Sequence, residues 1–199
     1  MGTLITSITV FFTLVYAAAC TPSRQMRDKD AAVIQNPVKM RFDKVQSFKD
    51  LIDSQSRYGG QYQKLLDSLN LNSADTVGFF IRPCFTHYGT LFRIEHSKCK
   101  EYFFKFSDSY TQVHQLGDRC VVGSNYFSFI GDHRPVPKRD SQDSVIIVPD
   151  CPVVLFTKLK DSFYYRKIDG YELKYFSDNS AAFKRLLQLT VQMATDKKE

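Results

Sequence analysis

Two pairs of cysteine and histidine offer the clearest chemistry in this 199-residue sequence. Cys84 stands three residues before His87, and His96 stands three residues before Cys99. Thiolate and imidazole groups at such spacings are ligands of tetrahedral zinc sites, so these four residues form a candidate metal site. In an oxidising compartment the two cysteines would instead be half-cystines, so the compartment decides between the two interpretations.

The number of cysteines favours disulfides. Five are present, and setting aside the one near the N-terminus leaves an even set. A hairpin predicted around residues 107–109 brings Cys99 close to Cys120 at its open end, within the Cα separation that a disulfide needs. Cys84 is then left to pair with Cys151. We therefore expect these two disulfides and no metal, with two other connectivities and the zinc site as alternatives.

Catalysis has little support in the sequence. Neither Gly-x-Ser-x-Gly nor His-Glu-x-x-His occurs. Glu95 and Glu101 are candidates for a pair of carboxylates of the glycosidase kind, but charged residues on strands usually face solvent. We therefore assign no catalytic residue and expect no cofactor.

The N-terminal segment has the features of an export signal. Residues 1–19 carry no charge, and their apolar run is shorter than the roughly 20 residues that cross a bilayer as a helix. The run ends in three alanines followed by Cys20, and small side chains at this place suit a signal peptidase. Residues 14–20 resemble the lipobox of bacterial lipoproteins.

This resemblance implies that diacylglycerol is attached to the Cys20 thiol before cleavage, and that Cys20 becomes the lipid-bearing first residue. Thr21 then stands where the best-known signal for inner-membrane retention has aspartate, which favours the outer membrane. The implied partner is a membrane, bound through the lipid anchor. The alternative is a secreted chain that begins at Cys20.

Three regions are predicted along the chain. Residues 1–19 are the signal peptide, and 20–37 are polar and poorly patterned, as expected of a flexible tether. Residues 38–199 form a single domain, long enough to bury a core of its own. The order of its elements predicts an α+β fold with an N-terminal helical segment, a mainly antiparallel β-sheet and a C-terminal helix.

Periodicity and turn residues predict the individual elements. Apolar residues three to four positions apart predict helices over 42–52 and 62–69, separated by Gly59-Gly60. The last helix is expected to follow a cap at 178–180. Strands are predicted at 77–85, 90–94, 102–106, 110–115, 121–122, 126–130, 144–148, 153–159, 163–168 and 171–176. Turns are predicted at Tyr88-Gly89 and Asp169-Gly170, and a long exposed loop at 131–142.

The formal net charge of +6 comes from basic residues scattered along the sequence, without a dense run. This pattern indicates a solvated face, and no nucleic-acid partner is expected. The sequence therefore predicts an envelope lipoprotein whose domain binds or scaffolds an unknown envelope protein or small ligand without catalysis. A secreted hydrolase is one alternative, and a carrier of lipid or another small ligand in a cavity lined by Phe and Tyr is another.

The anchor can be tested by replacing its thiol. Cys20→Ala removes the atom that would carry the lipid, so we expect the variant to leave the membrane fraction and the detergent phase. Phase partitioning of the native chain and the variant measures this. Equal partitioning of the two chains would exclude the lipoprotein interpretation.

Overall fold

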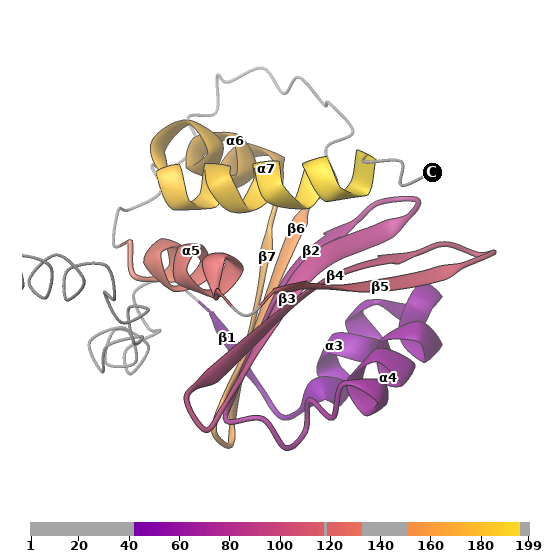
Figure 1. Cartoon of the computed structure of the whole chain (residues 1–199). Helices are drawn as coiled ribbons and strands as arrows, with labels where there is room; N and C mark the ends of the chain where they lie inside the picture. The colour runs from indigo at the N-terminus through magenta and orange to yellow at the C-terminus, as the bar shows by residue number, and fades with distance from the viewer. Residues whose placement is uncertain (1–41, 118, 133–150, 196–199) are drawn as a thin grey trace, which may run out of the picture.

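The computed structural model describes residues 42–117, 119–132 and 151–195. They form a seven-stranded antiparallel sheet in the order β1-β7-β6-β2-β3-β4-β5, with helices on both faces (Figure 1). The strands are β1 (Asp43–Val45), β2 (Thr76–Pro83), β3 (His87–Glu95), β4 (Lys98–Phe106), β5 (Thr111–Gly117), β6 (Val153–Leu159) and β7 (Ser162–Ile168). The helices are α3 (Phe48–Ser54), the short 3-10 helix η2 (Ser56–Tyr58), α4 (Gly59–Ser68), α5 (Val121–Ile130), α6 (Gly170–Asn179) and α7 (Ala181–Thr195). The expected α+β class is thus confirmed, C-terminal helix included.

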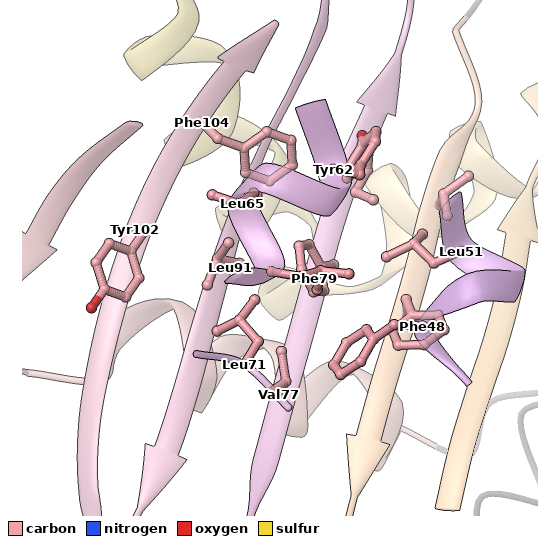
Figure 2. Packing of buried hydrophobic residues seen from close by; sticks show 14 of the residues in the cluster. Phe48, Leu51, Tyr62, Leu65, Leu71, Val77, Phe79, Leu91, Tyr102 and Phe104 are labelled. Atoms are coloured by element: carbon pink, nitrogen blue, oxygen red, sulfur yellow. The ribbon is translucent and has the colours of Figure 1, made fainter. Parts of the chain in front are cut away.

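One face of the sheet is covered by α3 and α4. Figure 2 shows Phe48 and Leu51 of α3 and Tyr62 and Leu65 of α4 directed at the sheet, where they meet Phe79 of β2. All five residues are buried. The apolar stripe predicted over 62–69 is therefore the face of α4 that packs on the sheet.

The other face is covered by α5, α6 and α7 (Figure 1). Phe129 of α5, Phe176 of α6 and Phe183 of α7 lie with their ring centroids 4.7 to 5.7 Å apart. Phe80 of β2 reaches the same cluster, at 5.6 Å from Phe183. None of the helices in the described ranges is long and apolar enough to cross a membrane.

The N-terminal helix begins later than its apolar spacing predicts. Residues 43–45 form β1, which pairs with β7 at one edge of the sheet. The side chain of Ser47 caps α3, and Asp50 completes a capping box by accepting from the backbone N–H of Ser47. The two helices are separated by η2 and not by Gly59-Gly60, which form the first two residues of α4.

Three of the predicted strands lie in helices. Residues 121–122 and 126–130 belong to α5, and 171–176 belong to α6. Asp169 and Gly170 do not make a hairpin turn, since the Asp169 carboxylate accepts a hydrogen bond from the Glu172 N–H and caps α6. The strand predicted at 144–148 and most of the loop predicted at 131–142 lie outside the described residues.

Gly89 lies inside β3, opposite Ile81, and not in the turn predicted there. The turn between β2 and β3 comes earlier, at residues 84–86. A Cβ at Gly89 would lie 2.4 Å from the carbonyl oxygen of Phe80 and 2.8 Å from the ring of Phe104. The missing side chain therefore allows close packing and is not needed for a turn.

A pair of glycine substitutions tests this packing. Gly89→Ala places a methyl group against backbone, and we expect it to lower the free energy of unfolding by about 2 kcal/mol or more. Gly60→Ala is the control, because nothing lies within 4 Å of its added Cβ on α4, and it is expected to stabilise by up to about 1 kcal/mol. Denaturant unfolding measures both, and a neutral Gly89→Ala would contradict the packing described here.

Candidate functional site

The turn between β3 and β4 has an unusual backbone. Glu95 and Lys98 form the last pair of the ladder, so His96 and Ser97 alone make the turn. Their φ angles are +47° and +63°, the left-handed values of a two-residue type I′ turn. Such turns favour Gly and Asn, and other residues are held there at a cost of about 1 kcal/mol or more each. The N–H of His96 donates to the Asp75 carboxylate at 3.3 Å, which supports the turn from outside.

Basic side chains gather beside this turn on one face of the sheet. The ladder places Arg93 opposite Lys100 and Glu95 opposite Lys98, and cross-strand partners share a face. Together with His96 these four residues line a half-open hollow of about 420 Å³. The hollow is therefore lined by three Lys and Arg side chains and one carboxylate.

The cations of the hollow differ in how they are held. The Arg93 guanidinium donates to the carbonyl oxygen of Leu69 and forms an ion pair with Glu95, so its position is fixed. Lys98 and Lys100 are exposed, and neither has an ion-pair partner in the part of the chain that the structure describes. Two ammonium groups are therefore available to a ligand beside a fixed third charge.

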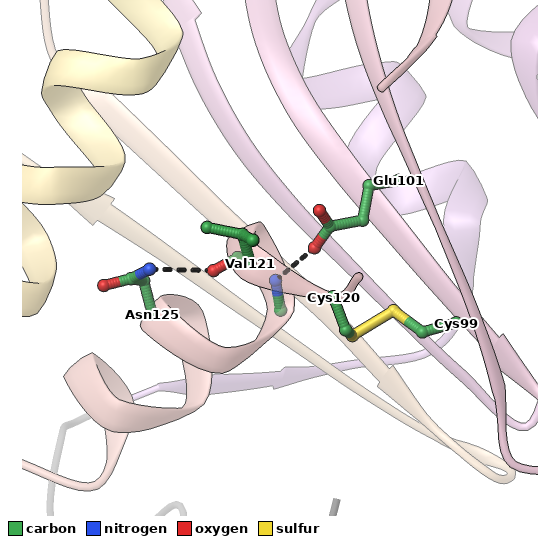
Figure 3. The surroundings of a disulfide bond; sticks show 6 residues. Cys99, Glu101, Cys120, Val121 and Asn125 are labelled. Atoms are coloured by element: carbon green, nitrogen blue, oxygen red, sulfur yellow. Dashed lines mark hydrogen bonds between the residues drawn. A yellow bond between two sulfur atoms is a disulfide. The ribbon is translucent and has the colours of Figure 1, made fainter. Parts of the chain in front are cut away.

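A disulfide holds the same hairpin from its other face. Cys99 lies between the two lysines, so its side chain points to the opposite face and bonds to Cys120 at the start of α5 (Figure 3). Cys120 has a φ of +51°, again in the left-handed region. This bond ties the hairpin covalently to α5, and it restricts motion of the turn that presents the basic residues.

Glu101 strengthens the joint between β4 and α5. Its buried carboxylate accepts from the N–H of Gly123 at 2.9 Å, at the N-terminus of α5 (Figure 3). Burial raises the pKa of Glu101, while the amide groups at the start of α5 act in the opposite direction. The carboxylate and both disulfide sulfurs lie within 4.8 Å of one another. Sulfurs joined in a disulfide lack the thiolate that a metal requires, so this group serves as a joint.

The four residues of the alternative zinc site are not brought together. Cys84 is bonded to Cys151, and Cys99 is bonded to Cys120, which is the pairing that the sequence favoured. The two histidines lie at opposite ends of β3, roughly 30 Å apart at the rise of an extended strand. The zinc interpretation is therefore wrong for this structure.

The other candidate residues are also separated. Glu95 lies on the face with the hollow, whereas Glu101 lies on the face with α5, so they do not form a pair of catalytic carboxylates. Cys20 lies outside the described residues. The basic hollow was not predicted from the sequence. The feature that could have indicated it is the presence of four basic residues, counting His96, within residues 93–100.

His87 is buried under the short helix η2 at the far end of the sheet. Its ring centroid lies 4.5 Å from that of Tyr58 and 6.2 Å from that of Tyr62. Its Nδ1 has no hydrogen-bond partner among the described residues. Burial, assisted by the positive charge of Arg57, lowers the pKa of His87 to about 4.

Comparison with known proteins found no match. No family model matches the chain, and neither the curated proteins nor the solved structures contain a significant relative.

The buried histidine predicts a pH dependence of stability. Because the pKa of His87 falls from 6.5 to about 4 on folding, the unfolded chain binds the proton first as pH falls. The free energy of unfolding is therefore unaffected by this histidine above pH 6.5. It falls between pH 6.5 and 4, by up to about 3 kcal/mol, because the unfolded chain gains the proton in this range. Denaturant unfolding at a series of pH values measures this slope. We expect His87→Asn to reduce the slope and the exposed His114→Asn to leave it unchanged; the reverse would contradict the assignment.

Proposed function

We propose that this chain is an exported binding module, anchored at the envelope through Cys20, that holds an anionic ligand at the turn between β3 and β4. The observation that carries the proposal is the hollow lined by Arg93, Glu95, His96, Lys98 and Lys100. Three basic side chains against one carboxylate give it a positive potential, and the net charge of +6 has the same sign.

The chemistry of the two lysines indicates the class of ligand. An ammonium group is a compact point charge with three donors, and it suits a phosphate or carboxylate oxygen approached from several directions. Arg93 is occupied by Glu95 and the Leu69 carbonyl, so it adds potential while Lys98 and Lys100 make the contacts. A group with more than one negative oxygen, such as a phosphate, would meet both lysines.

The rigidity of the turn supports a binding role. The hollow is lined by residues of β3, β4 and the turn between them, and the Cys99–Cys120 bond and the contact of His96 with Asp75 both restrain this end of the hairpin. A site that is already in its bound shape loses little conformational entropy when the ligand arrives. The left-handed residues His96 and Ser97 remain in place because of the same restraints.

Two sources could supply the phosphate chemistry: a soluble phosphate ester and the headgroup of an anionic lipid. The test uses the Cys20→Ala chain, so that no lipid anchor contributes. Pyrophosphate binding is measured by calorimetry. Cosedimentation is measured with phosphatidylcholine vesicles, with and without phosphatidylglycerol. Binding to pyrophosphate alone indicates a soluble ligand, and binding only to phosphatidylglycerol vesicles indicates a headgroup.

The residues are tested with a matched pair of double variants. Lys98→Gln with Lys100→Gln is expected to weaken binding about tenfold or more, the equivalent of about 1.4 kcal/mol. Lys167→Gln with Lys184→Gln removes the same charge from exposed positions on β7, three strands away from β3 in the sheet, and on α7, which covers the opposite face. This control should change affinity less than about twofold because distant exposed charges are screened. Equal losses in both would show a general charge effect, and no binding to either probe would overturn the proposed function.

A further inference from the structure

Among the residues that the structure describes, the strand β5 is an open edge of the sheet. It pairs with β4 on one side and is the last strand in the sheet order. All residues from Thr111 to Leu116 are exposed. Because successive side chains point to opposite faces of the sheet, both faces of β5 are open to solvent. The strand contains no Asp, Glu, Lys, Arg or Pro. Edges of this kind add further strands readily, because their outer N–H and C=O groups have no partner in the sheet.

The opposite edge is different. There β1 has only three residues, and two of them are the charged Asp43 and Lys44. Short length and charge are the usual protection of an edge against a further strand. One edge of this sheet is thus protected and the other is open.

The hydrogen bonding of the β4–β5 hairpin shows which groups of β5 face outward. The N–H of Ser107 donates to the carbonyl oxygen of Tyr110 at 2.9 Å, so Tyr110 directs its backbone groups at β4. Backbone direction alternates along an antiparallel strand, which turns the N–H and C=O groups of Thr111 and Val113 away from β4. Val113 lies at the middle of the open edge.

The side chains of the edge are arranged symmetrically about Val113. Its neighbours on either side are polar, Gln112 and His114, and the exposed apolar residues Tyr110 and Leu116 lie three positions away in each direction. In a symmetric dimer the same patch must be complementary to itself. An antiparallel copy of β5 centred on Val113 meets this condition, with Val113 opposite Val113 and Gln112 opposite His114.

From these observations we propose that a second copy of this chain adds to the sheet through β5, antiparallel and with the two-fold axis at Val113. An unrelated extended segment could form hydrogen bonds with the outward backbone groups of β5. A second copy of β5 also matches the side chains, because their order is symmetric about Val113. The charged, three-residue β1 edge limits the assembly to two copies. Because both copies carry a charge of +6, salt should strengthen the association by screening their repulsion.

The test uses a matched pair of valines. Val113 on β5 and Val191 on α7 are each 38% exposed, so neither supports the core. Sedimentation velocity of the Cys20→Ala chain is expected to show a monomer–dimer equilibrium that shifts towards dimer as salt is added. Val113→Lys places two like charges at the axis and should weaken the dimer about tenfold or more, while Val191→Lys should leave it unchanged.

Crosslinking gives a second measurement that does not depend on affinity. Residues directly opposite in a hydrogen-bonded antiparallel pair have Cα atoms about 5.5 Å apart, within the range of a disulfide. Oxidised Val113→Cys should therefore form covalent dimers much faster than Val191→Cys. A chain that stays monomeric at all salt concentrations, or equal behaviour of the two valine positions in both assays, would overturn the proposal. Loss of phosphate binding would not affect it, because β5 contributes nothing to the hollow.

Discussion

The architecture depends on β2, a strand that is buried on both faces. Val77, Phe79 and Ile81 enter the core shared with α3 and α4, while Phe80 enters the core shared with α5, α6 and α7. A sheet with one wet face needs one helical layer, but a central strand of this composition requires two. The helices before β2 in the sequence cover one face, and those after β4 cover the other. Gly78 completes the fit, because a Cβ there would lie 2.3 Å from the ring of Phe92.

Enrichment in aromatic and β-branched residues was sufficient to predict the central strands, because side chains of this kind fit the buried surface of a sheet. It failed where sequences that resemble strands become helices through tertiary contacts. The apolar α5 is held by the Cys99–Cys120 bond, by Glu101 at its N-terminus and by packing against Phe92, and none of these partners is near it in the sequence. In α6 the local signal was ambiguous, because Asp followed by Gly serves equally as a hairpin turn and as the start of a helix.

The candidate site was harder to predict than the fold. Three of its basic residues share a face only because His96 and Ser97 turn the chain in two residues, and neither is the glycine or asparagine that would signal such a turn. Without the position of the turn, the register that brings Arg93 opposite Lys100 cannot be inferred. The disulfides were easier to anticipate, because the hairpin around residues 107–109 left few geometries for Cys99 and Cys120.

The connectivity of the disulfides affects how the chain matures. The Cys99–Cys120 bond is nested inside the loop that Cys84–Cys151 closes. A chain that leaves an export channel N-terminus first presents Cys84 and then Cys99 to the oxidising machinery, and joining cysteines in that order makes the wrong bond. The native pairs then form only by exchange through a mixed disulfide. If the chain is exported as proposed, correct pairing would depend on an isomerase or on a delay in oxidation until Cys151 has emerged, and a compartment that only oxidises would accumulate misbridged chains.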